Sequence, residues 1–239
     1  MNKQQLAAKI WESANRMRSK IEANEYKDYI LGFIFYKYLS DKEERWLLSQ
    51  DYTPEDIQEY VNEEDEETVA NAQQSLGYFI AYKDMFSTWI QMGPDFSVDN
   101  VRTALSSFTR LISVSHKRVF EGIFNTLETG LSKLGDNTKS QTKAVSDLIQ
   151  LINDIPMDGK QDYDVLGFIY EYLISMFAAN AGKKAGEFYT PHDVVQLIAT
   201  MIEPYDGTLY DPCCGSGGMF IQSAELVKSK QGNLNGINV

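Results

Sequence analysis

The chain of 239 residues has only two cysteines, only six prolines and no long apolar run. Cys213 and Cys214 are adjacent, and neighbouring residues rarely meet disulfide geometry, so we expect reduced thiols and a cytoplasmic location. Two cysteines and two widely spaced histidines do not make a cluster of ligands, so no metal site is expected. The longest apolar run, Tyr29–Tyr36, is far shorter than the roughly 18 residues of a membrane span. We therefore expect no membrane segment, and the N-terminal residues contain no apolar signal core.

Basic residues are also scarce, and the formal net charge is −12. Such a chain is not expected to bind nucleic acid through its overall charge, so any such contact needs local basic patches or a partner that supplies the charge. The charge is uneven. Residues 1–45 hold nine Lys and Arg against seven Asp and Glu, whereas residues 51–67 hold nine acids and no base. This acidic run predicts a solvated helix face.

The first 180 residues have the hydrophobic period of a succession of helices, and 43% of the chain is hydrophobic, which is enough for a real core. Start signals at Thr53-Pro54 and Ser97 support two of these helices. Aromatic residues recur at helical spacing between residues 29 and 39, which predicts core packing rather than a platform for stacking a ligand. The expected helices cover residues 6–17, 29–48, 97–111, 116–134, 143–152 and 162–179, with another starting at Thr53 and a short extended piece at 76–80.

A glycine-rich, charged break at Asn180–Gly186 marks the best domain boundary. We predict a helical domain over residues 1–180 and a different pattern of loop, helix, strand, turn and helix over residues 181–239. The helix after the break starts at Pro191 with Thr190 as its N-cap, and it ends at Glu203-Pro204. On its own, the sequence Phe-Tyr-Thr-Pro before this helix is more often a helix cap with aromatic packing than a binding site.

A glycine-rich turn, Asp211-Pro-Cys-Cys-Gly-Ser-Gly-Gly-Met-Phe220, follows the apolar run Gly207–Tyr210 and precedes a helical pattern. Gly215 and Gly217 can adopt positive φ and let a ligand approach the backbone. The helix directs its amino end at the same place, and Asp211 can accept a hydrogen bond from a cationic amine. The carboxyl end of a strand is where open α/β sheets bind ligands, so the turn predicts a nucleotide-like cofactor.

The details of the turn narrow the choice of ligand. A dinucleotide fold has G-x-G-x-x-G, but Phe220 stands at the third glycine position. A P-loop needs Gly-Lys-Ser or Gly-Lys-Thr, and no lysine follows Gly217 or Gly218. An acid before the turn without a phosphate-binding lysine suits a cationic ligand that lacks a phosphate chain. S-adenosylmethionine has these properties.

Asp211–Phe220 resembles motif I of adenine-N6 DNA methyltransferases, D-P-x-x-G-[ST]-[GA]-G-[FM], and Glu187–Pro191 resembles their motif X. A long helical part followed by A-G-x-x-[AG]-[EQ]-[FY]-[FY]-T-P resembles the modification (M) subunit of type I restriction–modification systems over essentially the whole chain. The resemblance implies a mainly α fold: a helical N-terminal domain, then the truncated start of a doubly wound α/β methyltransferase domain that depends on S-adenosyl-L-methionine.

The resemblance also implies roles for residues. The segment from Glu187 to His192 would lie against the methionine and adenosine parts of the cofactor. Asp211 would contact the amino group of the cofactor, and the glycines that follow would form a backbone cradle. The cofactor residues implied in this way are Glu187, Phe188, Tyr189, Thr190, Pro191, His192, Asp211, Gly215, Ser216, Gly217 and Gly218. No metal is implied.

The catalytic Asn-Pro-Pro-[Phe/Tyr] motif of this family, which holds the flipped adenine, is absent from the sequence, so no catalytic residue is named. The acid of the second strand, which holds the cofactor ribose in such enzymes, is also missing. Residues 232–239 look like the loop and start of that strand. We therefore expect an N-terminal fragment or truncated product that is inactive alone and has an incomplete cofactor site.

The resemblance implies that the full-length protein is a site-specific DNA adenine-N6 methyltransferase. It would work in a complex with DNA, a specificity (S) subunit, a second M subunit and a restriction (R) subunit. The alternative is a non-catalytic helical protein-interaction module with an incomplete cofactor turn. A cluster at helical spacing could contact DNA, although an ordinary solvated face is the simpler interpretation of it. Its members are Lys9, Arg16, Arg18 and Lys20.

Overall fold

The protein is described by a computed structural model. The structure describes residues 1–17, 23–158, 165–180, 190, 192–214, 217–231 and 237–238, with side chains outside the description at 16–17, 23–26, 174–180, 192, 231 and 237–238. Two compact units are present, Met1–Asn180 and Ala181–Val239, which we call unit 1 and unit 2. None of the described helices combines the length and the hydropathy that a membrane span needs.

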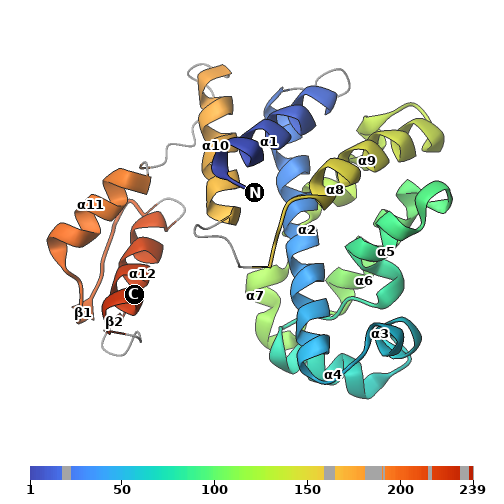
Figure 1. Cartoon of the computed structure of the whole chain (residues 1–239), viewed down its shortest axis with the longest axis horizontal. Coiled ribbons are helices and arrows are strands. Elements are labelled where there is room, and N and C mark those ends of the chain that lie inside the picture. Colours follow the sequence, from blue (N-terminus) through green and yellow to red (C-terminus); the bar gives the residue numbers. More distant parts are fainter. Residues whose placement is uncertain are drawn as a thin grey trace. The chain divides into compact units, whose positions relative to one another are not determined.

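Unit 1 is built from α-helices joined by short 3₁₀ turns (Figure 1). Its α-helices are α1 (Lys3–Met17), α2 (Ala23–Ser49), α3 (Pro54–Tyr60), α4 (Glu66–Ser75), α5 (Phe86–Gln91), α6 (Val98–Arg110), α7 (Lys117–Phe120), α8 (Asn125–Gly130), α9 (Thr138–Asn153) and α10 (Val165–Asn180). The 3₁₀ turns are η1 (Tyr82–Asp84), η2 (Gly93–Asp95), η3 (Val114–His116) and η4 (Leu131–Leu134).

Helix α2 is the axis of unit 1. It has 27 residues, which corresponds to about 40 Å of helix. Figure 1 shows it running through the middle of the unit, where it packs against α1, α5, α8, α9 and α10. Most of its residues between Tyr29 and Leu47 are buried or half-buried, so a helix this apolar is stable because its neighbours cover it on several sides.

The predicted helix starts at Thr53 and Ser97 are confirmed. The Thr53 hydroxyl accepts a hydrogen bond from the Asp56 N–H, and the Asp56 carboxylate accepts one from the Thr53 N–H, which makes a capping box. Ser97 caps α6 with Asn100 in the same way. The predicted first helix is confirmed as α1, where Leu6 and its neighbours on that face are buried; Trp11 on the predicted face is 38% exposed.

Three predictions for unit 1 were wrong in detail. The single helix expected over residues 116–134 is divided into α7, α8 and η4, because the chain leaves helical geometry at Glu121 and turns at Gly122, whose φ is +79°. Helix α9 starts five residues before the predicted Lys143, because Asn137 is its N-cap. The expected extended piece at residues 76–80 forms no strand.

Unit 2 contains α11 (His192–Ile202), β1 (Gly207–Thr208), α12 (Gly218–Gln231) and β2 (Ile237–Asn238). The strands are parallel, with Gly207 opposite Ile237 and Thr208 opposite Asn238. Helix α12 is therefore the crossover of a β-α-β unit, and α11 packs against it. The strand expected from the apolar run Gly207–Tyr210 covers only Gly207 and Thr208 among the described residues, where it pairs with β2.

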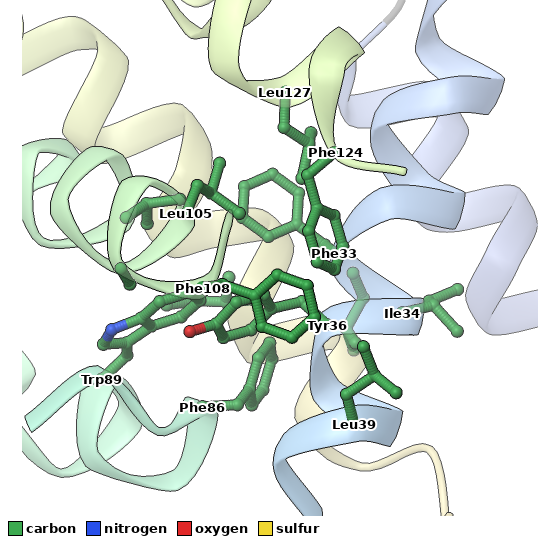
Figure 2. Close-up of a cluster of buried hydrophobic side chains, with 14 of the residues drawn as sticks. Phe33, Ile34, Tyr36, Leu39, Phe86, Trp89, Leu105, Phe108, Phe124 and Leu127 are labelled. Atoms are coloured by element: carbon green, nitrogen blue, oxygen red, sulfur yellow. The ribbon is translucent and has the colours of Figure 1, made fainter. Parts of the chain in front are cut away.

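The core of unit 1 is rich in aromatic side chains that α2 shares with α5, α6 and the segment before α8 (Figure 2). Tyr36 stacks on Trp89 with ring centroids 4.7 Å apart, and Phe108 meets Phe124 edge-on at 5.1 Å. All four side chains are 2% exposed or less. The aromatic residues of α2 within this cluster are thus packed in the core, as their spacing predicted.

A polar stripe on α2 holds the backbone of the segment Tyr78–Phe86. The Tyr36 hydroxyl donates to the Asp84 carbonyl at 2.9 Å, and the Ser40 hydroxyl accepts from the Phe86 N–H at 2.9 Å. One turn further, both carboxylate oxygens of Glu43 accept from the Ile80 N–H at 3.0 and 2.9 Å. The stripe residues are four and three positions apart, so they share one face of the helix and fix the position of a segment whose regular structure is limited to the three-residue η1 and the first residue of α5.

Two carboxyl groups in this region are buried, which costs folding free energy when they are ionised. Glu43 is 0% exposed and no described cation pairs with it, so burial raises the pKa of its carboxyl well above the ordinary value, although the hydrogen bond from Ile80 opposes this. Burial raises the pKa of Asp84 to about 6, with Lys83 opposing the shift. The Oδ2 atom of Asp84 is buried without a hydrogen-bond partner. The ionised form of each group therefore disfavours the folded state.

These shifts predict the direction of a pH dependence. A raised carboxyl pKa means that the folded state holds its proton more tightly, so this stability is fully present below the unfolded pKa, near 4, and is lost as the pH rises through the folded pKa. We expect the free energy of unfolding of unit 1 to fall as the pH rises through the folded pKa of Asp84, about 6, and to fall further as Glu43 ionises. Denaturant titration followed by tryptophan fluorescence measures it, because all three tryptophans lie in unit 1.

The matched variants are Glu43→Gln, which keeps an acceptor for Ile80 but cannot ionise, and Glu55→Gln, the same change at an exposed acid. Glu43→Gln should flatten the pH dependence, whereas Glu55→Gln should leave it unchanged. Glu43→Ala leaves the buried Ile80 N–H without an acceptor and should cost about 1–3 kcal/mol. An equal slope in wild type and Glu43→Gln would show that Glu43 is not the titrating group.

Candidate cofactor site

Helix α11 precedes the site in the sequence. Its described part confirms the expected end of the helix: α11 stops at Ile202, Glu203 has φ +49° and Pro204 follows. Thr190, the predicted N-cap, is exposed. Pro191 and the segment from Glu187 to Tyr189 lie outside the described residues, and His192 is described only by its backbone. The structure therefore does not test the contribution of motif X.

The turn between β1 and α12 is held by hydrogen bonds at both ends. At its start, the Cys213 N–H donates to Oδ1 of Asp211 at 2.8 Å. At its end, the Gly217 N–H donates to the Cys214 carbonyl at 2.8 Å, and the Gly217 carbonyl accepts the N–H groups of Phe220 and Ile221 at the start of α12. The described residues of the turn are therefore held by hydrogen bonds on both sides of Gly215 and Ser216, and the second side begins α12.

Gly217 has φ +80°, a conformation that a residue with a side chain adopts only with strain. A Cβ atom added at Gly217 would meet only the Phe220 ring, at 3.9 Å, and one added at Gly218 would meet nothing within 4 Å. Packing therefore does not explain why these positions lack side chains. An open backbone surface next to a helix amino end fits a ligand that approaches the main chain closely, so the residues present fit the cofactor expected here.

Asp211 has a second role that the sequence analysis missed. Its Oδ1 atom fixes the turn by accepting the N–H two residues ahead, and the signal for this was present, since aspartate commonly makes such a turn with its own backbone. The other oxygen has no hydrogen-bond partner in the described part of the chain, and the residue is half-buried. One carboxylate can therefore hold the turn and still accept a hydrogen bond from a bound amine.

Of the predicted cofactor residues, the structure places Asp211, Gly217 and Gly218 in one turn. Gly215 and Ser216 fall outside the described residues. Chemically, the turn offers a carboxylate oxygen, an exposed main chain and the amino end of a 14-residue helix. No group of three or more potential metal ligands occurs within the described part of the chain.

Comparison with known proteins identifies the family. Residues 161–239 match the family model of N-6 DNA methylases, and residues 6–152 match the HsdM N-terminal domain. The second match alone covers more than half of the chain. This chain belongs to the family of type I restriction-enzyme methylase subunits. The fold expected from the sequence, a helical N-terminal part followed by the start of a methyltransferase domain, is confirmed.

Individual relatives agree. The MpnII methylase subunit of Mycoplasma pneumoniae is 28% identical over 244 aligned residues, which cover 95% of this chain and 45% of that subunit. The MjaIX methylase subunit of Methanocaldococcus jannaschii is 26% identical over 96% of this chain and 41% of its own length. A type I methyltransferase subunit from Streptococcus thermophilus, known as a crystal structure, superposes with a TM-score of 0.77 at 29% identity and covers 99% of this chain and 52% of that one. This chain thus spans about half the length of these relatives.

The conformation of Gly217 yields a test. Gly217→Ala should strain the turn by about 1–2 kcal/mol, because L-residues disfavour positive φ. Gly218→Ala is the matched control, since Gly218 is helical and its Cβ would meet nothing. Hydrogen-exchange mass spectrometry on peptides that contain Gly217 and Phe220 should show faster exchange in Gly217→Ala alone. Equal exchange in the two variants would contradict the assigned turn geometry.

Proposed function

We propose that the chain forms part of a site-specific DNA adenine-N6 methyltransferase of a type I restriction–modification complex, which transfers a methyl group from S-adenosyl-L-methionine to adenine in DNA. Residues 1–180 are its helical N-terminal domain, and residues 181–239 begin its catalytic domain. The observation that carries the proposal is the turn after β1, with Asp211 at its start, an open glycine surface and a helix amino end, inside a region that matches N-6 DNA methylases.

In this proposal the residues bind and orient the cofactor. The free oxygen of Asp211 accepts a hydrogen bond from the amino group of the methionine part, and the main chain from Gly215 to Gly218 lies against the ligand. The segment from Glu187 to His192 covers the methionine and adenosine parts. When bound, the cofactor supplies an electrophilic methyl group on a sulfonium centre.

The proposal assigns catalysis to no residue of this chain, because the 239 residues contain no Asn-Pro-Pro. The proposed partners are DNA, a specificity subunit, a second methylase subunit and a restriction subunit. The net charge of −12 supports a complex in which a partner subunit makes much of the DNA contact, since a partner can supply the positive surface that DNA requires.

In the candidate basic cluster, only the side chain of Lys9 is described. Lys9 forms an ion pair with Asp154, at the end of α9, so this lysine joins two helices of unit 1. The side chain of Arg16, and Arg18 and Lys20 as a whole, lie outside the described residues. The alternative function is a non-catalytic helical protein-interaction module with an incomplete cofactor turn.

Cofactor binding separates the two functions. Ultraviolet cross-linking with labelled S-adenosylmethionine captures weak binding, and we expect it to label unit 2 of the wild-type chain. Asp211→Ala should strongly reduce the label, because it removes both the acceptor for the ligand and the support of the turn. Asp206→Ala, an exposed acid shortly before the turn, is the control and should label normally. Wild-type labelling no greater than that of Asp211→Ala would favour the interaction module.

Methyl transfer tests the assignment of catalysis. With labelled S-adenosylmethionine and adenine-containing duplex DNA, residues 1–239 alone should transfer no label to the DNA, because the group that holds the flipped adenine is missing. Incorporation that survives repurification of the chain and is lost in Asp211→Ala would show that these residues contain the catalytic group after all.

A further inference from the structure

We draw no further inference here: the strongest candidate, the exposed apolar face of helix α11 that Val194, Leu197 and Met201 form in unit 2, carries no proposal because nothing in the described part of the structure shows what covers it.

Discussion

The structure of unit 1 depends on the burial of helix α2, which leaves its polar groups only protein partners. Tyr36, Ser40 and Glu43 share one face, and each makes a hydrogen bond with the main chain between Ile80 and Phe86. That segment contains only the short η1 before α5 begins at Phe86, so α2 supplies hydrogen bonds that water would otherwise provide. Glu43 is thereby buried without a described cation, and its stripe lies beside the aromatic cluster that contains Tyr36 and Trp89.

A different constraint governs unit 2, which has little core and is organised by a turn. Asp211 fixes the first half of the turn through the Cys213 N–H, and Gly217 accepts a positive φ in the second half. The glycines have no side-chain neighbours that would require their small size. The turn therefore leaves main chain exposed at the amino end of α12, which is the feature on which the proposed cofactor site rests.

Helix α10 shows that sequence families and packing divide the chain differently. The match to N-6 DNA methylases begins at residue 161 and so includes α10, yet α10 packs against α1 and α2 of unit 1. The sequence break at Asn180–Gly186 marks a change of composition. It does not indicate which unit the apolar helix before it packs against. Local patterns also missed the division of residues 116–134 at Gly122, because the apolar positions continue through it while the backbone turns.

The sequence by itself determined the helical character of residues 1–180, the capped starts at Thr53 and Ser97, and the strand–turn–helix that contains Asp211 and Gly217, because caps, turns and helical periods are local properties of a few residues. Only the tertiary structure decided that Glu43 and Asp84 are buried, that Lys9 pairs with Asp154, and that the polar stripe of α2 binds the main chain between Ile80 and Phe86. These features depend on which distant or neighbouring groups exclude water from a side chain, and no local pattern contains that information.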